Sequence, residues 1–253
     1  MGFDDPNFYV ALLKIIWINI LLSGDNAVVI AMACRGLPDN LRNKGIFLGA
    51  GAAIGLRILF TFLIVLLLDV PYLKIVGSLA LIWIAVQLLA PHGDDVHSEK
   101  EATDNLWKAV GTVAVADVVM SLDNVIAIAA AAQGNWPLII IGLLISIPLI
   151  IAGSTLVMAL LTRFPILVWA GAGLLGWIAG EMLVTDPVIL GYFGAAHAPA
   201  GASPEAIMEA GDHFVHDNFY YPAALVGAVL VLIVGGWYRQ RKIAEGAHER
   251  SPA

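Results

Sequence analysis

The stretch Leu22-Ser23-Gly24-Asp25-Asn26 decides the fold class, because the chain repeats it as Met120-Ser121-Leu122-Asp123-Asn124. The two copies stand 98 residues apart, from Asp25 to Asp123, and the apolar residues around them match as well. Each copy places a carboxylate and an amide within an apolar run long enough to cross a bilayer. A carboxylate at that depth is costly and usually faces an interior cavity, where it serves function. We therefore expect a duplicated membrane protein with a site at the two Asp-Asn pairs.

The composition supports a membrane protein. Hydrophobic residues make up 60% of the 253 residues and charged residues only 13%, whereas a soluble domain carries about a quarter charged residues. Several apolar runs of roughly 18 residues or more predict spanning segments. Because backbone groups in lipid must be satisfied within each segment, these runs predict a helical bundle. The single cysteine, Cys34, excludes an internal disulfide and a metal site built from cysteines.

Seven spanning helices are expected, at residues 8–34, 45–68, 72–90, 106–132, 138–161, 166–184 and 221–238. Within the sixth of these helices, Ala172, Gly176 and Gly180 recur every four residues. Such a stripe of small side chains predicts close packing against another helix.

The duplication extends beyond the motif at an offset of 94 residues, which pairs Asp69-Val-Pro71 with Arg163-Phe-Pro165 and Gln87 with Glu181. Each repeat then holds three helices. Since three crossings are an odd number, the second repeat enters the membrane from the opposite side. Such an inverted repeat places a site near the bilayer midplane. The expected fold is an all-α polytopic membrane protein, with a 3+3 inverted repeat followed by one C-terminal helix.

The positive charges predict the orientation, because Lys and Arg are enriched in cytoplasmic segments. With the N-terminus outside and the C-terminus inside, the external side holds only Lys74, with Lys14 close to it. The cytoplasmic segments then hold Arg35, Arg42, Lys44, Lys100, Lys108, Arg163, Arg239, Arg241, Lys242 and Arg250. The chain divides accordingly into repeat 1 (1–91), a cytoplasmic acidic linker (92–105), repeat 2 (106–184), an external acidic loop (185–220), and helix 7 with a basic cytoplasmic tail (221–253).

The repeated motif predicts a cation site. Gly24 is the residue of the motif that favours a helix least, because Gly in a helix is less stable than Ala by roughly 1 kcal/mol. We therefore expect a local break in the helix at Gly24, which leaves backbone carbonyls beside Asp25 without helical partners. The site residues are then Ser23, Gly24, Asp25, Asn26, Ser121, Asp123 and Asn124. This set of oxygen ligands with two negative charges suits a hard divalent cation such as Mn²⁺, Mg²⁺ or Ca²⁺.

A purely structural interpretation competes with this one. Asn and Ser side chains in membrane helices often bond across helices, at roughly 0.6 kcal/mol each. For Asn19 and Ser121, taken singly, this interpretation is as good as a functional one. It is much weaker for Asp25 and Asp123, because each recurs together with its Asn neighbour.

Three further ionisable residues lie within the expected helices. Asp117 is the repeat-mate of Asn19, and Glu181 is the mate of Gln87. Either acid could add to the cation site or relay protons, and Arg57 is the natural counter-charge for one of them.

The external loop carries a second group of ionisable residues. Ser203-Pro204-Glu205 predicts the start of a helix. One face of that helix would carry Glu205, Glu209, Asp212, His213 and His216. This face could collect metal outside the membrane, but a solvated acidic segment is the favoured interpretation.

The paired motifs, Ser23-Gly24-Asp25-Asn26 and Ser121-Leu122-Asp123-Asn124, each followed by a helix rich in Ala and Val, resemble those of the TerC family of integral membrane proteins. The resemblance covers about residues 8–238. It implies a seven-helix metal exporter of the cytoplasmic (inner) membrane, related to the lysine-exporter-like transporters. It also implies Mn²⁺ as the preferred ion and places Asp25, Asn26, Asp123 and Asn124 at the site.

Three functions remain open on the sequence. The first is a secondary transporter that exports Mn²⁺ through alternating access of the two repeats. The second is an auxiliary membrane protein that supports metal loading of exported proteins. The third and least favoured is an intramembrane aspartyl hydrolase, because each Asp is followed by Asn and no Tyr-Asp or Gly-x-Gly-Asp motif occurs.

The expected partners follow from the favoured function. We expect no enzyme activity and no prosthetic group, with the divalent ion as substrate. The other partner is the lipid bilayer; no nucleic acid is expected, and a homo-oligomer is compatible with the sequence.

Overall fold

The computed structural model describes residues 6–21, 24–67, 70–90, 99–132, 135–199 and 201–249. Within these ranges, the side chains that lie outside the description are those of residues 6–7, 18–21, 61–62, 64–67, 99–102, 122–132, 136, 146 and 245–249. The described part of the chain is helical and contains no strand. Its helices are α1 (Pro6–Leu21), α2 (Gly24–Cys34), α3 (Asp39–Leu67), α4 (Leu73–Leu89), α5 (Glu99–Ala132), α6 (Trp136–Arg163), α7 (Ile166–Val184), α8 (Pro187–His197), α9 (Pro204–Asn218) and α10 (Tyr220–Glu249).

Several of these helices are long and apolar enough to cross a bilayer. Among the described residues, four segments meet this condition: Asp39–Phe60, Pro137–Arg163, Ile166–Val184 and Tyr220–Ala244. Three shorter apolar helices accompany them, at Phe8–Trp17, Gly24–Cys34 and Leu73–Leu89. The all-α class and the presence of several spanning helices are therefore confirmed. The count of seven spans, the inverted repeat and the orientation stay predictions.

The chain forms two compact units, and each unit takes helices from both halves of the sequence. The first unit comprises residues 1–68 and 93–167, which hold α1, α2, α3, α5 and α6. The second comprises residues 69–92 and 168–253, which hold α4, almost all of α7, and α8 to α10. Each unit thus combines residues from both expected repeats. The division of the sequence into two repeats stays a prediction.

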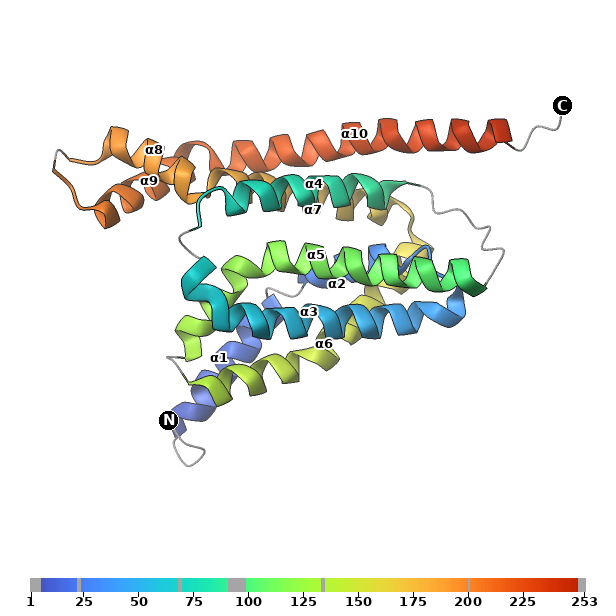
Figure 1. The fold of residues 1–253 in the computed structure, drawn as a ribbon, viewed down its shortest axis with the longest axis horizontal. Coiled ribbons are helices and arrows are strands. Elements are labelled where there is room, and N and C mark those ends of the chain that lie inside the picture. Colours follow the sequence, from blue (N-terminus) through green and yellow to red (C-terminus); the bar gives the residue numbers. More distant parts are fainter. Residues whose placement is uncertain are drawn as a thin grey trace. The chain divides into compact units, whose positions relative to one another are not determined.

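The packing within the first unit is reciprocal. Helix α3, from the first half, packs along α5, and the two lie side by side in Figure 1. Helix α6, from the second half, packs along α2 and α1, and both of these also contact α5. The α1–α6 contact forms an apolar core of Phe8, Ala11, Ile15, Leu138, Ile139 and Leu143. Each half therefore covers the motif-bearing helices of the other.

In the second unit, the stripe of small residues predicted on α7 packs against α10. A Cβ atom built on Gly176 would lie 2.5 Å from the carbonyl oxygen of Gly227, and one built on Gly180 would overlap the carbonyl of Ala223. The close approach of two helices is therefore confirmed. Its partner, α10, could not be read from the stripe itself.

We expect Gly180→Ala to destabilise the protein by about 1–3 kcal/mol, because the added methyl group must displace the α10 backbone. Gly173→Ala on the same helix is the matched control. A Cβ atom there would meet the Leu232 side chain at an ordinary 3.7 Å. Thermal unfolding in detergent micelles measures both; equal melting temperatures for the two variants would contradict this account of the crossing.

The segment expected as an external acidic loop, 185–220, is largely helical. The predicted start of α9 is confirmed, because the Ser203 hydroxyl accepts a hydrogen bond from the backbone N–H of Ala206 at 3.3 Å. The other helix of the segment, α8, was not predicted, although Asp186-Pro187 is a typical helix start. The two helices pack closely, and the ring of His197 stacks on that of Phe214 at 3.8 Å.

Asp186 ties the start of α8 to the start of α4. Its side chain is fully buried. One carboxylate oxygen accepts hydrogen bonds from the backbone N–H groups of Val188 (2.9 Å) and Tyr72 (3.3 Å), and the other accepts from Ile75 (3.2 Å). Tyr72 has a left-handed conformation with φ of 65°. A single carboxylate thus caps two helices, where helix dipoles favour negative charge.

Asp186→Ala is expected to lower the free energy of unfolding by about 3 kcal/mol or more, because three part-buried N–H groups lose their shared carboxylate acceptor. Ser203→Ala, which removes a single exposed cap, should cost only about 1 kcal/mol. Chemical or thermal unfolding of the two variants side by side tests this ratio. Similar losses at both positions would mean that Asp186 acts as an ordinary cap.

Candidate functional site

The first Asp-Asn pair lies in the opening turn of α2, directly after the end of α1. Gly24 is the first residue of α2 and has open space around its Cα atom. Asp25 is half-buried and Asn26 is buried. The backbone N–H of Asn26 donates to Oδ1 of Asp25 at 2.7 Å. A helix start leaves such N–H groups without helical partners and stabilises a nearby carboxylate. Residues 22–23 lie outside the described residues, so the expected break at Gly24 stays a prediction.

A closed polar network lies in the contact between α3 and α5. Arg57 of α3 donates from Nη2 to Oδ1 of Asp117 at 2.6 Å and from Nε to the hydroxyl of Ser121 at 3.1 Å. The Ser121 hydroxyl donates in turn to Oδ2 of Asp117 at 2.9 Å. All three side chains are buried, with exposed fractions of 1% for Arg57, 4% for Asp117 and 1% for Ser121. Both oxygens of the carboxylate are therefore bonded.

Helical geometry explains how the network forms. Asp117 and Ser121 are four residues apart on α5 and so share one face of that helix. Helix α3 packs along this face and supplies Arg57, the only charged residue between Lys44 and Asp69. The guanidinium group is always protonated and its planar fork suits a carboxylate. Of the two acids that the sequence offered as the counter-charge of Arg57, Asp117 is the one that pairs with it.

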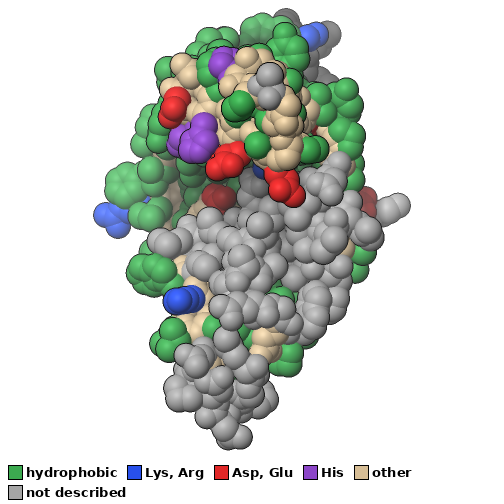
Figure 2. Space-filling view, turned by 90° about the vertical axis from the view of Figure 1, so that its left-hand side faces the viewer, with side chains coloured by type: hydrophobic (Ala, Val, Ile, Leu, Met, Phe, Trp, Pro, Cys, Tyr) green, Lys and Arg blue, Asp and Glu red, His purple; other side chains and the backbone are tan. Residues whose placement is uncertain are grey.

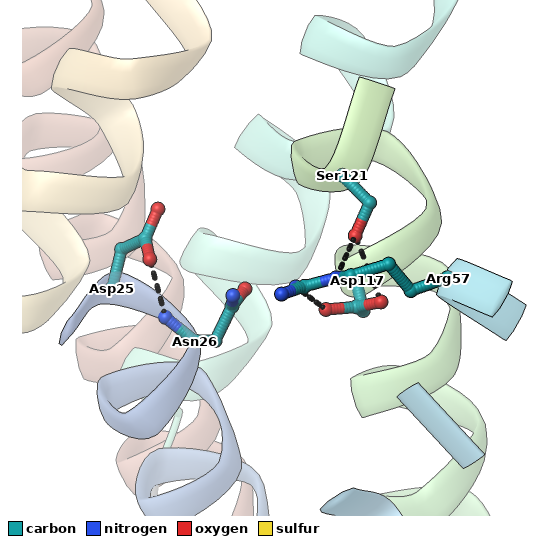
Figure 3. Close-up of polar contacts among 5 residues, drawn as sticks. All are labelled: Asp25, Asn26, Arg57, Asp117 and Ser121. Atoms are coloured by element: carbon teal, nitrogen blue, oxygen red, sulfur yellow. Dashed lines mark hydrogen bonds and ion pairs between the residues drawn. The ribbon is translucent and has the colours of Figure 1, made fainter. Parts of the chain in front are cut away.

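The network and the first motif lie next to each other. In Figure 3, the side chain of Asn26 extends from α2 toward the guanidinium group of Arg57. Five predicted site residues are therefore gathered here from three helices: Asp25, Asn26, Arg57, Asp117 and Ser121.

The other predicted site residues fall into two groups. The side chains of Asn19, Ser23, Asp123 and Asn124 lie outside the described residues, although 19 lies in α1 and 123 and 124 lie in α5. Glu181 and Gln87 belong to the second compact unit, on α7 and α4. Glu181 accepts a hydrogen bond from the indole N–H of Trp177 at 2.5 Å, and Gln87 is exposed.

The acidic face predicted on α9 lies at the surface. Figure 2 shows acidic and histidine side chains gathered on this end of the chain, where Glu205, Glu209, Asp212, His213 and His216 are exposed. Among the described side chains, no group of three His, Cys, Asp or Glu residues is arranged to hold a metal ion. The exposure of these side chains is what a solvated acidic segment requires, and metal binding by this face stays untested.

Comparison with known proteins identifies the family. The profile of the integral membrane protein TerC family matches residues 4–243. The uncharacterized membrane protein YjbE of Bacillus subtilis (strain 168) is 44% identical over 193 residues, which are 76% of this chain and 87% of that protein. The uncharacterized membrane protein YkoY of the same organism is 25% identical over 257 residues, covering 93% and 74% of the two chains. No solved structure matches the chain. The resemblance carried by the paired motifs is therefore confirmed, and the chain belongs to the integral membrane protein TerC family.

Proposed function

We propose that this protein is a secondary transporter that exports a divalent metal cation, Mn²⁺ in preference, through a site built from the two Asp-Asn motifs. The observation that carries the proposal is the state of Asp25. Its carboxylate lies in an apolar helix, accepts a single hydrogen bond among the described residues, and forms no ion pair with any of them. A carboxylate offers about four lone-pair sites, and the described residues occupy only one of those of Asp25.

The surrounding ligand chemistry supports a hard divalent ion. Asn26 follows Asp25 directly in the opening turn of α2, and α1 ends four residues before Asp25, at Leu21. The last turn of a helix leaves carbonyl oxygens without helical partners, and transporters use such ends to bind cations. Two aspartates, with amide and carbonyl oxygens, are ligands that suit Mn²⁺, Mg²⁺ or Ca²⁺. The choice of Mn²⁺ rests on the family resemblance.

The arrangement of the helices supports transport by alternating access. The reciprocal packing of α3 on α5 and of α6 on α1 and α2 is what an inverted repeat would produce. The sequence contains no phosphate-binding loop of the nucleotide-hydrolysing kind, so an ion gradient would drive export. The distribution of Lys and Arg supports a cytoplasmic C-terminus, and the family resemblance supports location in the cytoplasmic (inner) membrane.

The proposal is tested by Mn²⁺ flux into proteoliposomes that contain the purified full chain. We expect the wild-type protein to move Mn²⁺ under an imposed ion gradient and the Asp25→Ala/Asp123→Ala variant to move none. Asp39→Ala serves as the control, because Asp39 lies at the surface with its side chain 89% exposed. Absence of flux in the wild type under proton, sodium and potential gradients would contradict transport and favour the auxiliary function.

A further inference from the structure

A surface groove lies near the start of α3, at the end of the helix that the sequence predicts to be cytoplasmic. It has a volume of about 390 Å³ and is lined by Asn43, Lys44, Phe47 and Leu48. Phe47 is 63% exposed and Leu48 37% exposed, so the walls of the groove offer apolar surface. Two polar side chains therefore stand beside exposed apolar surface on a helix that is long and apolar enough to cross a bilayer.

The groove continues along α3 as a strip that two glycines leave open. Lys44, Leu48, Gly51 and Gly55, which we call the open strip, follow at intervals of four, three and four residues and so share one face of the helix. A Cβ atom built on Gly51 or Gly55 would meet no other atom within 4 Å. From Lys44 to Gly55 the strip extends about 16 Å along the helix axis, and one leaflet of the hydrocarbon core is about as thick, roughly 15 Å.

The charge of Lys44 suits an anion that comes from outside the chain. Lys44 is exposed and forms no ion pair with any described side chain, whereas the neighbouring Arg42 pairs with Asp39 at 2.6 Å. A lysine beside apolar surface holds its ammonium group at the polar boundary of the membrane, where it attracts anionic lipid headgroups. The side-chain amide of Asn43 adds N–H donors for the same headgroup. The groove thus combines a positive end with an apolar continuation.

We propose that this face of α3 binds a phospholipid with an anionic headgroup. The lipid phosphate accepts hydrogen bonds from Lys44 and Asn43, and one acyl chain passes between Phe47 and Leu48 and follows the open strip. A second copy of the chain fits this face less well. In a two-fold symmetric pair that meets along the strip, each residue faces its own counterpart, so the two Lys44 ammonium groups would repel each other. The inference does not depend on the proposed transport of a cation.

The test is native mass spectrometry of the purified full chain, titrated in detergent with phosphatidylglycerol, which is anionic, or with phosphatidylcholine, which is zwitterionic. We expect the wild-type protein to bind phosphatidylglycerol more tightly. Lys44→Gln should lower the affinity for phosphatidylglycerol by roughly fivefold, which is the effect of one lysine near an anionic membrane surface. The affinity of this variant for phosphatidylcholine should stay close to that of the wild type.

Lys108→Gln is the matched control for charge. Lys108 is an exposed lysine of α5 and does not line the groove. It lies at the same end of the molecule as Lys44, because α3 and α5 are parallel: Gly45 adjoins Leu106, and the two helices start on the same side in Figure 1. The substitution removes the same charge as Lys44→Gln and should leave the affinity for phosphatidylglycerol nearly unchanged.

Gly51→Leu tests the course of the acyl chain. The added side chain fills the open strip and should lower the affinity for phosphatidylglycerol several-fold, because the acyl chain loses its contact with the helix. Gly51→Ala adds a single methyl group and should keep most of the affinity. Since the space around Gly51 is open, both variants should fold. Thermal unfolding without added lipid checks that they do.

Four results would overturn the inference. One is equal affinity of the wild-type protein for the two lipids. Another is an equal loss in Lys44→Gln and Lys108→Gln, which would indicate a general attraction of lipid to this end of the molecule. A third is an unchanged affinity for phosphatidylglycerol in folded Gly51→Leu protein. The last is a lipid-free dimer of the wild-type chain that Gly51→Leu converts to a monomer, because a second copy would then occupy the strip.

Discussion

Replacement of Arg57 by Met is expected to lower the free energy of unfolding by about 3–5 kcal/mol, because it leaves the buried Asp117 carboxylate without its positive partner. Asp117 is 4% exposed and its remaining partner would be the Ser121 hydroxyl. Asp117→Leu should cost a similar amount for the reverse reason, since the Arg57 guanidinium cannot lose its charge. Thermal or chemical unfolding in detergent micelles measures both losses.

The Arg57→Met/Asp117→Leu double variant separates the pair from its surroundings. Replacement of a whole buried ion pair by apolar side chains is often neutral or stabilising, so the double variant should recover most of the stability lost in either single variant. Additive losses in the double variant would contradict this, and would indicate that each side chain has important partners outside the pair.

Asp25→Asn is expected to reduce Mn²⁺ transport by a factor on the order of 100 or more, because it removes one of the two charges of the proposed ion site while nearly preserving side-chain shape. The loss should appear in affinity for Mn²⁺ as well as in flux, since the proposed function makes this carboxylate a ligand. Asp25→Glu keeps the charge on a longer side chain and should retain part of the binding. Flux into proteoliposomes and Mn²⁺ binding to the purified protein measure the two effects.

Asp39→Asn provides the control for the Asp25 substitution. Asp39 begins α3 and carries the same functional group, but its side chain is 89% exposed and pairs at the surface with Arg42. Surface pairs of this kind contribute little, so its loss should leave transport unchanged. Equal losses of transport in the Asp25→Asn and Asp39→Asn variants would show that the Asp25 carboxylate has no specific role in ion binding.

The sequence determined the membrane class, most helix positions and the candidate site, because all three depend on local pattern. Apolar runs of bilayer length predict helices whatever their neighbours are, and α4, α6 and α7 lie close to their expected ranges. The repeated Asp-Asn pair predicted a candidate site, since carboxylates in apolar runs are rarely without function. The stripe containing Gly176 and Gly180 likewise predicted a close helix contact.

Only the tertiary structure decided which residues meet across the chain. The sequence offered both Asp117 and Glu181 to Arg57, and the packing of α3 along α5 selected Asp117, 60 residues away. It also brought the N–H groups of Tyr72 and Ile75 to Asp186, more than 100 residues later. The packing of helices from one half of the chain on helices from the other half could not be predicted from the sequence either. An apolar face shows that a helix is covered but not which helix covers it. Partner choice depends on the combined fit of surfaces that lie far apart in the sequence, and no local pattern contains that information.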